Sequence, residues 1–235
     1  MPTPKTPPET SASPGRRLRK PDAAATRENI LFVARQEFAT HGLSGARVDA
    51  IAALTHTTKR MLYYYFGSKE GLYLAVLEQA YGDIRAIEQT LDLEHLAPAE
   101  AIRRLVEFTF DYQDAHPDFV RLVSIENIHH ARYLATSEKI RSLNVTVIES
   151  LAAILARGRA EGVFHTDADP VDLHLVISAL CFSRVSNRYT FGALFGRDMA
   201  EPALRARHKQ LAADAVVRLL QGDVSRIQSV ARRQG

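Results

Sequence analysis

The chain has one cysteine, Cys181, among its 235 residues, and it lacks long apolar runs. A single cysteine cannot form an intramolecular disulfide, which suits a reducing cytosol rather than an oxidising compartment. No stretch approaches the about 18 uninterrupted apolar residues that a bilayer-spanning helix needs. The N-terminus also lacks the apolar h-region of a secretory signal. These absences predict a cytoplasmic protein without a membrane partner.

The sequence also lacks the motifs of several enzyme classes. It has no phosphate-cradling glycine loop, no nucleophile elbow and no zinc-type spacing of cysteine and histidine. Glu126 and His129 form one Glu-x-x-His pair, but a di-iron bundle needs a second pair and two further glutamates. An acidic group that could in principle bind a cation consists of Asp167, Asp169, Asp172 and His174. Asp169 before Pro170 is more simply a helix start. We therefore expect no catalysis, no cofactor and no metal, and a metal sensor stays as an alternative.

Beyond residue 22 the apolar residues recur at helical spacing, without a convincing alternating strand. Proline at the first turn of a segment and glycine just past its end recur along the chain, as they do at helix boundaries. The pattern predicts an all-α fold of about nine helices.

Residues 47–70, RVDAIAALTHTTKRMLYYYFGSKE, carry the most specific pattern. A short amphipathic helix, a polar break and a second short helix with cations and tyrosines indicate a helix-turn-helix DNA reader. The segment is similar to the DNA-binding domain of the TetR family of bacterial repressors. The matching positions are Ile51, Ala52, Thr58, Leu62, Tyr63, Tyr65, Phe66, Ser68, Lys69 and Glu70.

The resemblance implies a division of the chain into domains. Residues 23–70 are expected to form a three-helix DNA-binding domain, and residues 71–222 a helical ligand-binding and dimerisation domain, before a tail at 223–235. Residues 1–22 are rich in proline and poor in apolar residues, which predicts a disordered basic arm. The arm is either a solubilising tail or a flexible contact to phosphates or a minor groove.

The charge distribution agrees with a DNA-facing N-terminal part. Residues 1–70 hold 11 Lys and Arg against 6 Asp and Glu, whereas the remaining residues hold 19 against 21. A basic front is expected where one end of a protein meets phosphate, although so small a surplus also arises by chance.

The resemblance also supplies candidate DNA contacts. Lys59 and Arg60 begin the second reader helix and are assigned to base or near-base contact, with solvent near the phosphates as the alternative for Arg60. Thr58 is expected to cap that helix, and Tyr63 and Lys69 match the family's phosphate-binding residues. Tyr64 and Tyr65 are alternatively core aromatics, and the same alternative stands for Phe66 and Tyr63. The complete predicted DNA-binding set is Arg47, Thr57, Thr58, Lys59, Arg60, Tyr63, Tyr64 and Lys69.

The turn departs from the family pattern. Thr55-His56-Thr57 stands where the family usually has Ala-Gly-Val. His56 takes the position that glycine fills because it tolerates positive φ, so the change either weakens the turn or adds a DNA contact.

For the C-terminal part, the resemblance implies a homodimer through helices at 170–193 and 202–222 and a pocket for an unidentified small-molecule inducer. The expected partner is double-stranded operator DNA, and the expected activity is repression that the inducer releases. Polar residues in apolar helical context are the ligand candidates: Asn127, His129, His130, Arg132, Arg184, Asn187 and Arg188. The arginines among them suit an acidic ligand. A protein-interaction bundle without a DNA role is the competing interpretation.

Overall fold

The computed structural model describes residues 23–222, which form helices and connecting turns with no strand among them. The predicted arm at 1–22 and tail at 223–235 lie outside the described residues. The helices are α1 Ala23–Gly45, α2 Val48–Leu54, α3 Lys59–Phe66, α4 Lys69–Glu88, α5 Pro98–Ala115, α6 Pro117–Ile128, α7 Glu138–Ala160, α8 Pro170–Ser186, α9 Arg188–Phe195 and α10 Pro202–Gln221. Two short 3₁₀ turns lie at Gln89–Leu91 and Leu134–Thr136. The all-α prediction is confirmed.

The helix count exceeds the expected nine because the predicted helix at 170–193 is two helices. Asn187 interrupts it with φ −103° and ψ 10°, and α9 continues beyond the break to Phe195. Neither proline nor glycine marks this break in the sequence, so the helical periodicity alone predicted one continuous helix.

Helix boundaries follow the local sequence. The side chain of Ser68 accepts a hydrogen bond from the Gly71 amide at 3.0 Å and caps α4. Asp169 caps α8 through the amides of Val171 and Asp172, so its helix-start interpretation is confirmed. Each cap satisfies amides that the first helical turn leaves without a partner.

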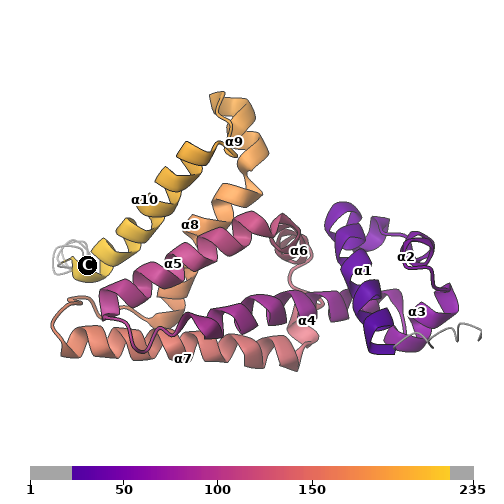
Figure 1. Ribbon diagram of the computed structural model, residues 1–235, viewed down its shortest axis with the longest axis horizontal. Coiled ribbons are helices and arrows are strands. Elements are labelled where there is room, and N and C mark those ends of the chain that lie inside the picture. The colour runs from indigo at the N-terminus through magenta and orange to yellow at the C-terminus, as the bar shows by residue number, and fades with distance from the viewer. Residues whose placement is uncertain (1–22, 223–235) are drawn as a thin grey trace, which may run out of the picture.

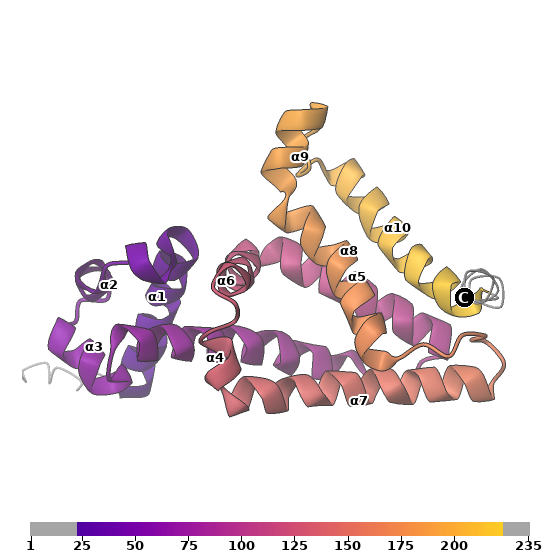
Figure 2. The same ribbon diagram turned by 180° about the vertical axis from the view of Figure 1, so that it is seen from behind.

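The apolar residues form two cores, and α5, α7 and α8 contribute buried residues to both. The first joins α1, α2 and α3 to α4 and α6, and it includes the buried side chains of Phe38, Ile51, Leu62 and Tyr73. The second is built from α5, α7, α8 and α10. Figure 1 shows the α1–α3 bundle at one end of the molecule and α10 at the other, with α4 extending from the bundle beside α7. From behind, the same order is visible, and α8 crosses between α7 and α9 (Figure 2).

A buried arginine ties α1 to the C-terminal helices. The Arg35 side chain is only 9% exposed; its Nη1 lies 2.9 Å from Asp83 of α4, and its Nε pairs with Asp118 of α6. An ion pair with so little solvent around it is sensitive to loss of either partner. The position of the N-terminal bundle is therefore coupled to α4 and α6.

No helix within residues 23–222 is both long enough and apolar enough to cross a membrane.

Candidate DNA-binding and ligand-binding sites

The α2–α3 turn has the positive φ at position 56 that the family pattern implies. His56 has φ 52°, a left-handed conformation, and its side chain is exposed. The amides of His56 and Thr57 donate to the carbonyls of Ala53 and Ala52 at 3.3 and 3.0 Å. The turn thus keeps its hydrogen bonds although a histidine occupies the glycine-type position, at a conformational cost that glycine would not have.

The start of α3 is fixed by its cap. The hydroxyl of Thr58 accepts a hydrogen bond from the Met61 amide at 3.2 Å, which confirms the predicted cap. Lys59 pairs with Asp49 of α2 at 3.2 Å, and both side chains are at least half exposed. An exposed pair of this kind contributes little, about 0–1 kcal/mol, so it can open for another partner. Arg60 is exposed.

The three consecutive tyrosines of α3 have different environments. Tyr63 and Tyr64 are 39% and 78% exposed, so the core alternative for Tyr64 is wrong. Tyr65 and Phe66 are partly buried against the first core, as expected for core aromatics. This division follows the 3.6-residue period, because Tyr65 follows the buried Leu62 by three positions.

The remaining predicted DNA contacts flank the reader helices. The backbone amide of Arg47 donates to Glu37 of α1 at 2.9 Å, while its side chain is exposed. Lys69 donates to the Ser44 carbonyl at 3.4 Å and is partly exposed, as is Thr57. All eight predicted DNA-binding residues are thus at least partly open to solvent.

Sequence spacing gave no signal for the Lys59–Asp49 pair, because this pair forms only when α2 and α3 pack together.

Close packing joins α3 to α4. Gly67 ends α3 with φ 75°, and a Cβ built on Gly71 would lie 2.1 Å from the Phe66 carbonyl oxygen. The first turn of α4 can approach the end of α3 this closely only because residue 71 has no side chain.

The predicted ligand residues fall into two separate groups. Asn127, His129, His130 and Arg132 are exposed at or just beyond the end of α6, and none of them lines a cavity described below. The other three, Arg184, Asn187 and Arg188, lie at the α8–α9 junction. Asp114 of α5 pairs with both Arg184 and Arg188, so their positive charges are already partly balanced within the fold. Burial alone would raise the pKa of Asp114, but hydrogen bonds from Arg205 and Arg184 bring it below its usual value.

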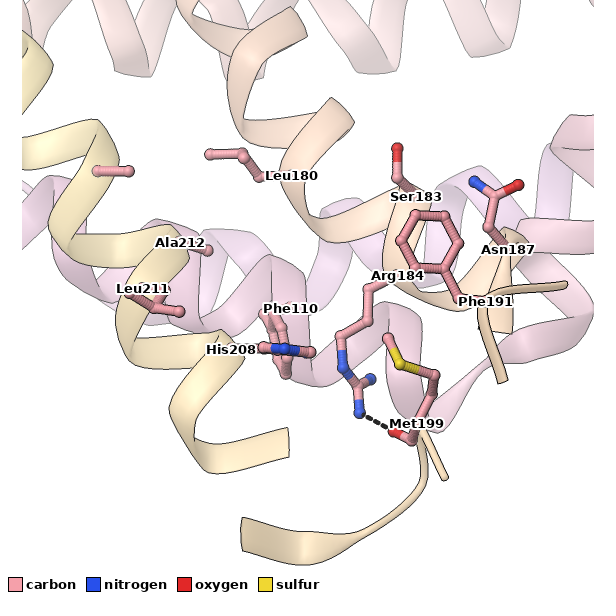
Figure 3. A pocket seen from close by; sticks show the side chains of 11 residues that line it. Phe110, Leu180, Ser183, Arg184, Asn187, Phe191, Met199, His208, Leu211 and Ala212 are labelled. Atoms are coloured by element: carbon pink, nitrogen blue, oxygen red, sulfur yellow. Dashed lines mark hydrogen bonds between the residues drawn. The ribbon is translucent and has the colours of Figure 1, made fainter. Parts of the chain in front are cut away.

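Arg184 and Asn187 line a groove of about 440 Å³ that is floored by Phe110 of α5 and bounded by α8, α9 and α10. Figure 3 shows the Arg184 guanidinium in this groove, where it donates to the Met199 carbonyl at 2.6 Å. We call this space the outer groove. It runs between exposed apolar residues such as Leu180 and Leu211, which are 40% and 54% exposed.

A smaller space of about 250 Å³ lies among five helices. We call it the inner cavity. Its walls are mostly apolar and aromatic, with polar groups from α4, α5, α7 and α8. The lining residues are Tyr81, Ile84, Arg85, Thr109, Gln113, Phe119, Val123, Leu134, Asn144, His174, Ser178 and Phe182.

The ionisable groups of the inner cavity are strongly affected by burial. Burial and the nearby positive charge of Arg85 lower the pKa of His174 to about 4, so this imidazole is neutral at physiological pH. Burial raises the pKa of Tyr81 to about 12. Sequence reasoning missed Arg85 as a cavity residue. The available signal was its place beside Ile84 on the stripe of α4 that also contains Leu77, where helical spacing favours an apolar residue.

Two of the carboxylates considered for metal binding, those of Asp169 and Glu126, have structural roles. Asp169 caps α8, whereas His174 faces the inner cavity. Glu126 is 2% exposed and accepts hydrogen bonds from the amides of Tyr133 and Leu134, which hold the turn after α6. The Glu-x-x-His pair therefore uses its carboxylate to fold the chain.

Two family models match the chain. One is described as bacterial regulatory proteins of the tetR family and covers residues 30–76; the other, a tetracyclin repressor-like C-terminal domain, covers residues 98–216. The chain is 35% identical over 201 residues to the HTH-type transcriptional repressor NicS of Pseudomonas putida strain KT2440, across 86% of this chain and 95% of NicS. It is 33% identical over 160 residues to the HTH-type transcriptional repressor SCO4008 of Streptomyces coelicolor, across 68% of this chain and 78% of that protein. The crystal structure of SCO4942 from Streptomyces coelicolor matches with a TM-score of 0.62 and 28% identity, over 83% of this chain and 97% of that one.

Proposed function

Because this chain belongs to the TetR family of bacterial transcriptional regulators, we propose that it binds operator DNA as a homodimer and releases it when a small molecule occupies the inner cavity. It is a DNA-binding regulator of transcription. The observation that carries the proposal is that one helix connects the two sites. Helix α4 begins beside the reader helices at Lys69, and its residues Tyr81, Ile84 and Arg85 line the inner cavity. The protein acts where the bacterial chromosome lies, in the cytoplasm.

The proposed DNA contacts divide into two kinds. Lys59 and Arg60, at the N-terminal end of α3, read base edges in the major groove. Tyr63 and Lys69 contact phosphates, which supply affinity without sequence choice. Their exposure supports these roles, and the pair between Lys59 and Asp49 opens when DNA approaches.

Salt-dependent binding tests this division. Lys69→Ala should weaken binding to all duplexes and reduce the slope of log affinity against log salt by about one. Arg60→Ala should instead change the preference among operator variants by about 1–3 kcal/mol at one base pair. Arg104→Ala is the matched control, because this exposed arginine lies on α5 outside the reader. Equal losses on every duplex for both reader variants would contradict the division.

The proposed dimer uses the exposed apolar side chains of α8 and α10. Large apolar residues are 40% to 66% exposed along these two helices, at Val171, Leu175, Leu180, Leu211 and Leu219. So many exposed apolar side chains on adjacent helices are typical of an association surface, and a two-fold dimer would present two reader helices to one operator.

Light scattering after size exclusion tests the dimer. Leu175→Glu or Leu219→Glu should give monomers, because a charge would be buried in the apolar interface. Val145→Glu is the control, since Val145 is similarly exposed, at 50%, but lies on α7. Dimers that persist in both interface variants at micromolar concentration would show that another surface holds the subunits together.

The proposed inducer acts through α4. A ligand releases DNA only if it binds more tightly to one arrangement of the two DNA-binding domains than to the other. Contact with α4, which joins the cavity to the reader helices, supplies such a difference in affinity. Ser178→Phe should fill the inner cavity and abolish ligand-induced release while operator binding remains. Ser142→Phe, on the exposed face of α7, should leave release unchanged. Retained release in the Ser178→Phe variant would exclude the inner cavity as the inducer site.

A further inference from the structure

The inner cavity has one formally charged lining residue, Arg85. Its side chain is 8% exposed, its Nη1 pairs with Glu88, and its Nε is buried without a hydrogen-bond partner among residues 23–222. Glu88 does not line the inner cavity; together with Arg85 it lines a separate hollow between α4 and α7, so Arg85 alone of the pair borders both spaces. A guanidinium has five donors, so the Glu88 pair leaves capacity for a second acceptor.

Arg85 lines the inner cavity together with His174, whereas Glu88 does not. The imidazole has its pKa lowered by burial and by the positive charge of Arg85. Burial, the larger cause, disfavours any charge there, whereas the positive charge of Arg85 favours an anionic group in the ligand. The neutral imidazole also keeps one N–H that can donate to such an anion.

Gln113 of α5 adds a second requirement on the ligand, which is a hydrogen-bond donor. Its side chain is 5% exposed, and its Oε1 is buried without a hydrogen-bond partner in the described part of the chain. A buried acceptor left without a partner destabilises the protein, so a ligand that donates a hydrogen bond there gains affinity by satisfying it.

Size and shape restrict the ligand further. A volume of about 250 Å³ lies below the range of about 300–1,000 Å³ that is usual for drug-sized ligands. Tyr81, Phe119 and Phe182 supply aromatic walls, against which a flat ring packs well. The outer groove is larger, but the dimer proposed above would cover it.

We propose that the inner cavity selects a small planar monoanion that also carries a hydrogen-bond donor, of the class of hydroxylated ring carboxylates, with the anion at Arg85 and the donor at Gln113. This assignment rests on the proposed role of the cavity as the inducer site. The anion recruits the free donors of Arg85, and the donor satisfies the orphaned oxygen of Gln113.

Calorimetric titration of the full chain with three probes tests the ligand class. The probes are 4-hydroxybenzoate, its neutral analogue 4-hydroxybenzamide, and benzoate, which lacks the donor. Binding of 4-hydroxybenzoate should be tightest, and the loss of either feature should weaken binding by about tenfold or more. Equal affinity for the neutral analogue, or no binding of 4-hydroxybenzoate at millimolar concentration, would overturn the assignment.

Variants locate the binding site. Arg85→Met with Glu88→Met removes the buried pair as a unit, so no charge is left unpaired, and it should abolish the preference for the anion. The matched control is Arg103→Met with Asp214→Met, a pair 2.7 Å apart between α5 and α10 that does not line the cavity. Gln113→Leu should make benzoate and 4-hydroxybenzoate bind equally. An anion preference that survives in the Arg85 variant but is lost in Arg184→Met would place the ligand in the outer groove and overturn the assignment.

Operator binding of the same preparation separates this inference from the proposed function. A protein that binds operator but discriminates none of the probes refutes the ligand class alone. A protein that binds the anion but holds its operator unchanged supports the ligand class and refutes the inducer role of the cavity.

Discussion

Replacing Gly71 by alanine should weaken the junction between the reader helix and α4. Alanine is usually preferred to glycine in a helix by about 1 kcal/mol. At position 71, however, the added methyl would lie 2.1 Å from the Phe66 carbonyl oxygen, and backbone must move to relieve the overlap. Overpacking of this kind costs about 1–3 kcal/mol. The net effect should be a loss of about 1–2 kcal/mol and a displaced α3.

Gly82 provides the matched control on the same helix. A Cβ there meets nothing within 4 Å, so Gly82→Ala should stabilise the protein by about 0.5–1 kcal/mol. Urea denaturation followed by circular dichroism measures both variants, and their free energies of unfolding should differ by about 1.5–3 kcal/mol. Operator affinity should fall only for Gly71→Ala. A Gly71→Ala protein that is as stable as Gly82→Ala would refute the close approach of α4 to α3.

Three further variants test the Thr58 cap, the His174 imidazole and the ion pair between Arg35 and Asp118. Thr58→Ala should cost about 1 kcal/mol of stability in urea, because the Met61 amide loses its acceptor; an unchanged midpoint would contradict the cap. Because the pKa of His174 is lowered to about 4 in the folded state, the folded state binds fewer protons than the unfolded state below pH 6.5, and stability should fall between about pH 6.5 and 4. His174→Gln should remove about 1–2 kcal/mol of that fall by pH 5, a figure reduced to allow for the partial exposure of the imidazole. Parallel pH profiles for the variant and the original protein would contradict this role of His174. Arg35→Met should cost about 3 kcal/mol, because it leaves the Asp118 carboxylate largely buried without its cation, and a loss below about 1 kcal/mol would contradict the coupling of α1 to α6.

The N-terminal part of the fold could be predicted because its signals are local. Thr58 and Ser68 cap the helices that follow them, and Leu62 lies on the buried face that its spacing indicates. Even the backbone at His56 followed from one departure in the turn, since that position needs positive φ whichever residue occupies it.

The C-terminal site could not be predicted in the same way because it depends on contacts between distant helices. Arg184 and Arg188 stood out as polar residues in apolar helices, but Asp114, 70 or more positions earlier, pairs with both. Arg85 and Gln113 face a common cavity only after α4, α5 and α8 have packed together. Periodicity identifies the buried face of a helix, but it does not give the helix that lies against it.

The most direct test of the central claim is a titration of the purified protein on the duplex upstream of its own gene. Random duplex serves as competitor, and the salt concentration is fixed because phosphate contacts make every affinity salt-dependent. The account predicts a discrete complex with two protein chains per duplex that resists the competitor and is lost when Lys59 and Arg60 are both replaced by alanine. Binding no tighter than to random DNA, or binding indifferent to that double substitution, would contradict the claim that α3 reads this operator.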